Sequence, residues 1–363
     1  MSGDSLEDPL ILVLYNDEEQ AFHKVAADLI ALQETVRVAM HLNDALSTCG
    51  YRTFLIPVRN SLNELKKALQ PFSPETAFIF NNCDGFDGIN MAATKVTRLI
   101  ETLGFRHTGS TASASTICID KGRAKRRLDA AGVPTPRYQV FNKAEGAFRF
   151  AFPAIVKPLT DDASLGIDLG SVVSTQSEML ERIAYISEHY DQAALVEEFI
   201  HGRELAVSMW GNQVVEALPI SEQDYSLIEN PLHHLLTYES KWIPESYYYN
   251  NILTCCPARL EPEDVQRVSE TALRAYRALG MRDFGRADIR YKDGIPYVID
   301  INEVPDLAPA AGFSNSAAAA GYSYVEMVGH LLEIALEREG FKCQKPILKS
   351  LSPRLQTASA SSD

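Results

Sequence analysis

The chain has 363 residues, 46% of them hydrophobic and 23% charged, which argues against a disordered or fibrous protein. At roughly 100–200 residues per domain, this length predicts two or three domains. Its 48 acidic and 34 basic residues give a formal net charge of −14, which repels the phosphate backbone of nucleic acids, so we expect no nucleic-acid partner.

The start of the sequence carries no pattern for export or for membrane insertion. The apolar run at 10–15 is too short to span a bilayer, and residues 1–8 carry acids where a secretory signal would carry bases. The six cysteines lack CxxC spacing, so reduced thiols are expected. We therefore expect a cytoplasmic protein without a membrane partner.

The first third of the chain alternates strand and helix patterns. Strands are predicted at 10–15, 51–58 and 76–82, and helices at about 21–49, 61–69 and 89–103. Such alternation is typical of an α/β fold with a doubly wound parallel sheet. We place this Rossmann-like first domain at 1–115.

The remainder has a less regular, α+β pattern. Helices are predicted at 117–132, 176–189, 262–280 and 323–339. Strands are predicted at 152–158, 194–200, 203–210, 213–219, 286–291 and 296–302, with an irregular stretch at 221–250. We divide this part into a central unit at 116–210, a C-terminal unit at 211–345 and a disordered polar tail at 346–363.

The last two strands predict a metal site. A hairpin turn at 292–294 would place Asp288 across from Asp300. Because side chains alternate faces along a strand, Arg286 shares a side with Asp288, and Asn302 shares one with Asp300. Two carboxylates and an amide oxygen are hard ligands that suit Mg²⁺. The alternative is an exposed hairpin with charges on its solvent face.

Three lysines could face that metal. Lys157 ends a buried strand just before a proline, and the small residues at 161–166 suit a loop that folds over phosphate. Lys121 lies in a basic helical stretch that, by itself, indicates a solvated face. Lys241 lies in the irregular stretch and cannot be interpreted by itself.

A strand–turn–strand pattern spans 196–204. Its Glu197 and Glu204 could flank a nucleotide at a crossover between two strands. Ordinary acids at the edge of a strand explain this pattern equally well.

Together these segments resemble a known family. They occur in the order found in ATP-grasp enzymes, and the match is closest to the D-alanine–D-alanine ligase-like branch. The motifs are DK at 120–121, IVKP at 155–158, VEEFIxGRE at 196–204, YxxK at 238–241, RADIR at 286–290 and DIN at 300–302. The similarity runs from about 75 to 335 and is strongest at 107–136. It implies an ATP-grasp fold, a homodimer, and functional roles for the three lysines.

By this resemblance, ATP would lie between two antiparallel sheets. Lys121 and Lys157 would neutralise its phosphates, Lys241 would reach the γ-phosphate, and the loop that holds Ser164 would close over the site. The adenine and ribose would meet a set of residues from one segment, namely Glu197, Glu198, Phe199, Ile200 and Glu204.

The resemblance also implies the chemistry. Asp288, Asp300 and Asn302 would hold Mg²⁺ or Mn²⁺, and Arg286 would stabilise charge that develops on the substrate. ATP would phosphorylate a carboxylate, and an amine would then displace phosphate, leaving ADP. The expected enzyme is an ADP-forming carboxylate–amine ligase.

Several positions depart from the family pattern. Asp300 replaces a glutamate, Asp306 replaces a glycine near the substrate carbonyl, and Trp242 replaces a tyrosine. The small-residue loop has Ala-Ser at 163–164, and residues 81–85 replace a histidine–glycine segment. All but the first of these changes touch or border the acceptor side, so we expect substrates other than two D-alanines.

Candidate substrate residues on that side are Asn82, Asp84, Asp306 and Ser314. The same segments resemble a ligase-like group associated with specialised amino-acid conjugates. One such role attaches an amino acid to the cyclohexenone core of mycosporine-type sunscreens, where ATP would activate an enol oxygen. The alternatives are a cell-wall D-alanine–D-alanine ligase and a non-catalytic nucleotide-binding protein.

Overall fold

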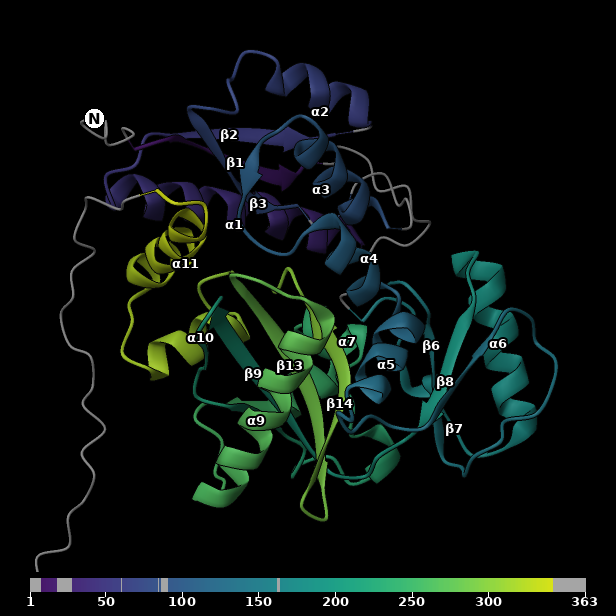
Figure 1. The fold of residues 1–363 in the computed structure, drawn as a ribbon. Coiled ribbons are helices and arrows are strands. Elements are labelled where there is room, and N and C mark those ends of the chain that lie inside the picture. The colour runs from purple at the N-terminus through teal and green to yellow at the C-terminus, as the bar shows by residue number, and fades with distance from the viewer. Residues whose placement is uncertain are drawn as a thin grey trace, which may run out of the picture.

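The computed structural model contains three β-sheets with helices packed around them (Figure 1). It describes residues 8–17, 28–59, 61–83, 85, 91–161 and 164–341. Asp84 and the predicted tail at 346–363 lie outside these residues. Among the helices in these ranges, none combines the length and the apolar character needed to cross a bilayer.

The first sheet is parallel and has the strand order β2–β1–β3–β4. Its strands are β1 (Leu10–Asn16), β2 (Thr53–Val58), β3 (Ala77–Asn82) and β4 (Arg106–His107). They are connected through α1 (Asp28–Thr48), α2 (Leu62–Leu69) and α3 (Ala92–Thr102). Every residue of β3 is buried, as expected for a strand covered on both faces. The predicted parallel α/β fold of this part is confirmed.

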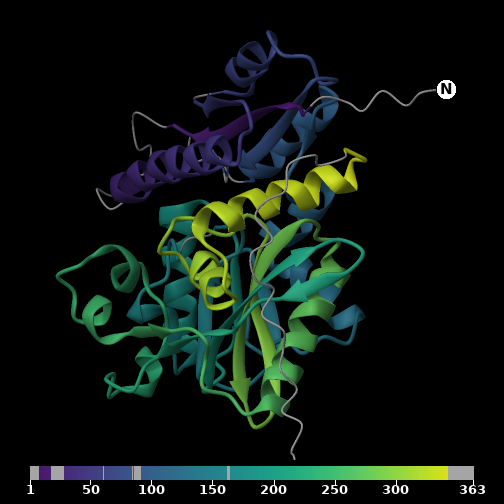
Figure 2. The same cartoon turned by 90° about the vertical axis from the view of Figure 1, so that its left-hand side faces the viewer.

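The two faces of this sheet are covered by different parts of the chain. On one face, Leu12 and Leu14 share a core with α2 and α3. On the other face lie α1 and α11 (Tyr324–Arg338), which run side by side (Figures 1 and 2). Phe78 and Phe80 belong to the same core cluster as Leu331 of α11. The beginning and the end of the described chain therefore stabilise each other.

A second, antiparallel sheet has the order β5–β8–β6–β7. It consists of β5 (Tyr138–Phe141), β6 (Ala154–Pro158), β7 (Val172–Val173) and β8 (Ala194–Glu198). The helix α6 (Gln176–Tyr190) packs its buried Met179, Ile183 and Ile186 on one face of this sheet.

The third sheet is also antiparallel, with the order β12–β11–β9–β13–β14 and with β10 on the end of β9. Its strands are β9 (Arg203–Gly211), β10 (Val215–Ala217), β11 (Ser221–Asp224), β12 (Leu253–Cys255), β13 (Phe284–Lys292) and β14 (Ile295–Asn302). The helix α9 (Pro262–Leu279) covers one face, where its Val268, Ala272 and Tyr276 join the core of the sheet. The opposite face is left for the site described below.

The strands β8 and β9 follow each other in sequence but lie in different sheets. At the crossover, a Cβ on Gly202 would collide with the carbonyl group of Tyr291, so only glycine lets the chain pass this close to β13. The predicted central unit at 116–210 includes β9, whereas the structure pairs β9 with β11 and β13 of the third sheet.

Two element predictions need correction. The single helix predicted at 117–132 is two helices, α4 (Ala112–Ile119) and α5 (Lys121–Ala130). The break is at Asp120, which is extended and accepts a hydrogen bond from the Arg123 amide at 2.9 Å. The stretch at 221–250, predicted as irregular, contains β11, a short 3₁₀ turn, α7 (Tyr238–Trp242) and α8 (Tyr247–Asn251). The helix α10 (Gly312–Ala319) was not predicted.

Asp283 joins the first and third sheets. Its fully buried carboxylate accepts hydrogen bonds from the amide of Gly109 at 2.8 Å and from Asn212 at 3.0 Å. Arg338 of α11 donates to both of its oxygens, at 2.8 and 2.9 Å. One carboxylate thus connects the end of the first domain, the third sheet and the last helix.

Candidate active site

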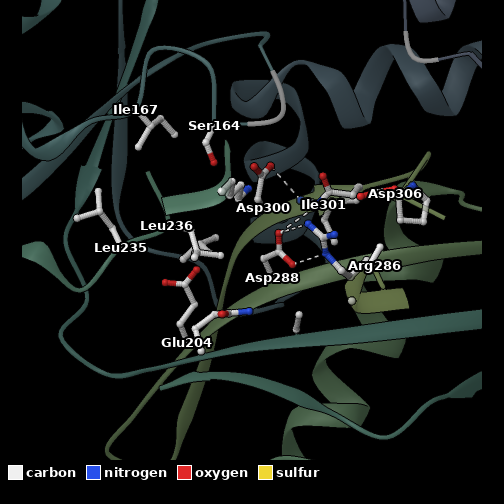
Figure 3. Close-up of a pocket in the computed structure, with 18 of the residues that line it drawn as sticks. Ser164, Ile167, Glu204, Leu235, Leu236, Arg286, Asp288, Asp300, Ile301 and Asp306 are labelled. Carbon is white, nitrogen blue, oxygen red and sulfur yellow. Dashed lines mark hydrogen bonds and ion pairs between the residues drawn. The ribbon is translucent and has the colours of Figure 1, made fainter. Parts of the chain in front are cut away.

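A cavity of about 500 Å³ lies between the two antiparallel sheets (Figure 3). Fifteen of the predicted site residues line it, namely Asn82, Lys121, Lys157, Ser164, Glu197, Glu198, Phe199, Ile200, Glu204, Lys241, Arg286, Asp288, Asp300, Asn302 and Asp306. Segments far apart in sequence therefore meet around one space. Ser314 does not line this cavity, because its buried hydroxyl donates to the carbonyl of Ala308 at 2.7 Å.

The helix α5 directs two lysines inward. Lys121 and Lys125 are four residues apart and buried, whereas Arg123, Arg126 and Arg127 of the same helix are exposed. The basic helical face indicated by the sequence is thus solvated only in part. The ammonium group of Lys121 donates to the backbone carbonyl of Asp161, at the start of the loop that holds Ser164.

Glu197 lies between two lysines in the wall of the cavity. Its Oε1 lies 2.6 Å from the Nζ of Lys157, and its Oε2 lies 2.5 Å from the Nζ of Lys125. Burial alone would raise the pKa of Glu197, but the two lysine charges outweigh this effect and hold the pKa below its ordinary value. Burial also lowers the pKa of Lys125, which is further anchored on the hydroxyl of Thr135 at 2.8 Å.

Asp288 and Asp300 lie directly opposite each other on β13 and β14, as the hairpin pattern predicts. The register shifts after this pair, because Ile289 is opposite Val298 and Ile299 is an extra residue on β14. Burial would raise the pKa of Asp300, but the charges of Lys121 and Lys157 outweigh it and lower the pKa.

Arg286 is bound to Asp288 rather than directed freely into the cavity. Its Nε and Nη2 donate to the two oxygens of Asp288 at 2.7 and 2.8 Å (Figure 3). Burial opposes the charge on Arg286, but the neighbouring carboxylate prevails and raises its pKa. Asn302 donates its side-chain amide to the same Asp288 at 3.0 Å. Among the described residues nothing donates a hydrogen bond to the amide oxygen of Asn302, so this oxygen can serve as a ligand.

These oxygens fit a divalent cation by their chemistry, since two carboxylates and one amide oxygen are the donors that Mg²⁺ prefers. Over the described part of the chain, no group of three or more His, Cys, Asp or Glu side chains is arranged to hold a metal. A cation here would depend on two aspartates, one asparagine and the phosphates of a bound nucleotide.

Lys241 reaches the cavity from α7, which Thr237 caps through a hydrogen bond to the Ser240 amide at 3.1 Å. Burial lowers the pKa of Lys241, and the charge of Arg286 lowers it further, while Asp288 opposes both effects. The lysine is thus electrostatically coupled to the paired aspartates and lies at the same end of the site.

The other end of the cavity is an apolar slot with acidic side chains at its edge. Its apolar lining comes from Ile155, Ile167, Phe199, Leu235 and Leu236. Glu198 is paired at its edge with exposed Arg137, whose Nε donates at 2.9 Å.

The sequence did not identify Lys125, Arg290 or Tyr225, which hold the carboxylates of this site. The sequence pattern could have identified the first two. Lys125 is one helical turn after Lys121, and Arg290 continues the alternation of Arg286 and Asp288. Tyr225 follows β11 in a stretch without periodicity, so no sequence pattern could have identified it.

Comparison with known proteins identifies the family. A family model described as "D-ala D-ala ligase C-terminus" matches residues 128–333, which is more than half of the chain. The chain belongs to the D-alanine–D-alanine ligase family. The predicted ATP-grasp fold and the assignment as an ATP-dependent ligase are thereby confirmed.

Two individual relatives are similar to this ligase over most of its length. An uncharacterized protein, y4sG, from Sinorhizobium fredii is 31% identical over 307 residues, which cover 83% of this chain and 88% of that protein. A D-alanine–D-alanine ligase from Desulforudis audaxviator is 31% identical over 301 residues, which cover 81% of this chain and 91% of the relative.

Solved structures share the fold. The D-alanine–D-alanine ligase from Bacillus anthracis complexed with ATP matches 92% of this ligase with a TM-score of 0.71 and 22% identity, over 99% of its own chain. The VanG D-Ala:D-Ser ligase from Enterococcus faecalis matches 91% with a TM-score of 0.69 and 19% identity, over its full chain (100%).

Proposed function

We propose that this ligase joins an amino acid to a small carboxylate or enol acceptor, with ATP split to ADP and phosphate, and that its substrates are not two D-alanines. The observation that carries the proposal is that three lysines from separate segments meet two paired aspartates around one cavity. Such a concentration of cations beside oxygen ligands suits a nucleoside triphosphate.

In the first step, an oxygen of the acceptor attacks the γ-phosphorus and ADP leaves. Lys121 and Lys157 offset the charge of the phosphates, and Lys241 approaches the transferring group from α7. Positive groups fixed in a buried site stabilise the transition state because they need no reorganisation during the reaction.

Asp288, Asp300 and Asn302 would hold Mg²⁺ or Mn²⁺. When bound, such an ion neutralises phosphate charge and orients the transferring group. The lowered pKa of Asp300 keeps its carboxylate charged and available as a ligand at neutral pH.

In the second step, the amine attacks the activated carbon and phosphate leaves with the oxygen. Arg286 lines the cavity next to this space, and its Nη1 makes no hydrogen bond within the described part of the chain, since the pair with Asp288 uses Nε and Nη2. A guanidinium in this position suits the negative charge that develops on the adduct. Activation of an enol oxygen, as in mycosporine-type conjugation, would use the same phosphoryl-transfer residues.

The acceptor side favours a substrate other than D-alanine because Asp306 lines the cavity where the family pattern has a glycine. The names of the ligases among its relatives favour the second candidate, synthesis of a D-alanine dipeptide. The two candidates differ in their products.

The test is a screen for ADP release across amino acids and small acceptors, with mass spectrometry of the products. Release that depends on one amino acid is expected, and Lys241→Ala or Asp300→Ala should abolish it. Lys292→Ala, which removes an exposed lysine from the turn of the same hairpin, is the matched control and should leave release unchanged. A D-alanine dipeptide would favour the second candidate, and ATP binding without turnover on any substrate would contradict both.

Asp306→Gly tests the acceptor side. The variant should change which amino acid or acceptor supports ADP release, because it removes a negative charge from the cavity wall. The measurement is the ratio of kcat/KM between acceptors. An unchanged ratio would show that Asp306 does not select the substrate.

A further inference from the structure

The cavity also reaches the first domain. This part, which we call the acceptor end, is lined by residues of α1, by Asn82 at the end of β3 and by the segment 303–312 that follows β14. Val38 of α1 and Leu307 of that segment belong to the same hydrophobic core, so the two walls pack against each other. The acceptor end is therefore built from segments far apart in the sequence.

The charged side chains that line the acceptor end are all acidic. They are Glu34 of α1 and, in the segment after β14, Glu303 and Asp306. Among the described residues of these walls, no lysine or arginine lines the cavity, whereas Lys121 and Lys157 line the part that suits phosphates. Carboxylates that share a site repel one another, and a bound cation relieves this repulsion.

Asp306 uses only one of its oxygens within the protein. Its Oδ1 accepts a hydrogen bond from the amide of Ala308 at 2.8 Å, and its Oδ2 makes no hydrogen bond with any described residue. The hydroxyl of Tyr324 donates to the carbonyl of Leu307 at 3.0 Å instead. Burial raises the pKa of Tyr324, and the charge of Asp306 raises it further, so this phenol stays neutral.

The guanidinium groups near these carboxylates are already paired. Arg286, which lies on the same side of the cavity as Asp306 (Figure 3), binds both oxygens of Asp288. Arg37 pairs with Glu34 at 3.2 Å, but it is exposed and does not line the cavity. The acceptor end thus keeps a net negative charge.

Asn82 independently indicates a polar ligand at this end. Phe78 and Phe80 of β3 point to the face that α11 covers, and Asn82 continues this alternation to the edge of the cavity. Asn82 is only 9% exposed, yet its side-chain amide makes no hydrogen bond with any described residue. A buried amide without a partner is costly, so a ligand that supplies the missing hydrogen bond would be stabilised here.

We infer that the acceptor end binds an amino acid whose side chain carries a positive charge, with Glu303 and Asp306 facing the cation and Asn82 accepting a hydrogen bond from it. This inference rests on the proposed ligase function and names the class of one substrate. The cation is separate from the amine that reacts, since an attacking amine must be neutral. The glycine of the family pattern at position 306 would supply no such charge.

The test measures the binding of amino acids to the full chain by calorimetry. The protein is first saturated with Mg²⁺ and adenylyl imidodiphosphate, an ATP analogue whose terminal phosphoryl group is not transferred. Lysine, ornithine and arginine are compared with norleucine, which has the length of lysine but lacks the side-chain ammonium, in both stereochemical forms. At least one basic amino acid should bind about tenfold more tightly than norleucine, the effect of one charged hydrogen bond.

Asp306→Asn removes the charge but keeps the oxygen that accepts from the Ala308 amide. It should weaken the binding of that basic amino acid about tenfold and leave norleucine unchanged. Glu303→Gln should do the same and serves if Asp306→Asn fails to fold. Asp44→Asn is the matched control, because it removes an exposed carboxylate of α1 that does not line the cavity, and it should leave both affinities unchanged.

The outcomes separate this inference from the proposed function. Equal weakening of the basic amino acid and norleucine in Asp306→Asn would overturn the inference, because a merely structural role affects both alike. So would a wild-type protein that binds norleucine as tightly as every basic amino acid, or that binds none of them. ADP release that depends on a neutral amino acid would then leave the ligase proposal standing, whereas absence of nucleotide binding would overturn both.

Discussion

Glu197 makes the stability of the cavity wall depend on pH. Its pKa in the folded protein is below the ordinary value of 4.5, so its contribution to stability is present above pH 4.5 and is lost as the pH falls through the lowered pKa. Glu197→Gln removes this charge from between two buried lysines. We expect it to lower the free energy of unfolding by about 3 kcal/mol at neutral pH.

Urea unfolding of both proteins between pH 7 and pH 3 measures this effect, with the pKa of a free carboxyl inside the range. The difference between wild type and Glu197→Gln should shrink in acid. Glu198→Gln is the control, because Glu198 pairs with the exposed Arg137 and should cost less than about 1 kcal/mol. A difference that stays constant with pH would contradict the assignment of the charge to Glu197.

At this scale the sequence predicted the residues that line the cavity better than the contacts they make. Asp288 and Asp300 were placed opposite each other because a turn fixes the register of a hairpin. The pairing of Glu197 with Lys125 and Lys157 was not predicted, because it joins a helix and two strands whose packing no local pattern specifies.

Among the elements, α5 depends on Asp120, which ends one helix and caps the next. Asp120→Ala should lower the free energy of unfolding by about 1 kcal/mol, the usual value of an N-cap. It should also raise the KM for ATP, since α5 begins at Lys121 in the cavity wall. Urea unfolding and ADP release measure the two effects.

Asp120→Asn retains a capping side chain and is the matched control, with stability and KM near those of the wild type. An unchanged KM in Asp120→Ala would show that the cap does not position Lys121.

The elements that were predicted well have a regular hydrophobic pattern or a residue that clearly marks their end. Continuous apolar runs gave β1 and β3, and Gly50, in the left-handed conformation at φ 86°, follows the end of α1. The short helices α7 and α8 could not be predicted. Five residues each are too few for a periodic pattern, and their ends depend on caps such as Thr237.

At the scale of the whole molecule, Asp283 holds the first and third sheets together. Asp283→Asn removes the charge of the fully buried carboxylate that pairs with the partly buried Arg338, which then keeps its second ion pair, with Glu339. We expect a loss of about 3 kcal/mol in the free energy of unfolding, measured in urea.

Asp293→Asn is the matched control, because Asp293 lies exposed in a hairpin turn with φ 49°, which asparagine also tolerates. It should leave the midpoint in urea unchanged. Equal midpoints for both variants would mean that the joint between the sheets does not limit stability.

The three-sheet arrangement follows from the sequence only through the family resemblance. Local patterns predicted the strands, but they do not predict that β8 and β9 belong to two different sheets around a cavity. That separation depends on contacts such as the close approach of Gly202 to Tyr291, which join residues far apart along the chain.

The extra residue on β14 has a practical consequence. Ile299, the extra residue, has no cross-strand partner on β13 and lines the cavity next to Asp300. Exchanging Ile299 for a smaller or a polar side chain would alter the dielectric surroundings of the adjacent carboxylate without disturbing the cross-strand partner that fixes it. If the proposed metal site is occupied, a substitution at Ile299 would change the metal preference while the proposed ligands Asp288, Asp300 and Asn302 stay intact.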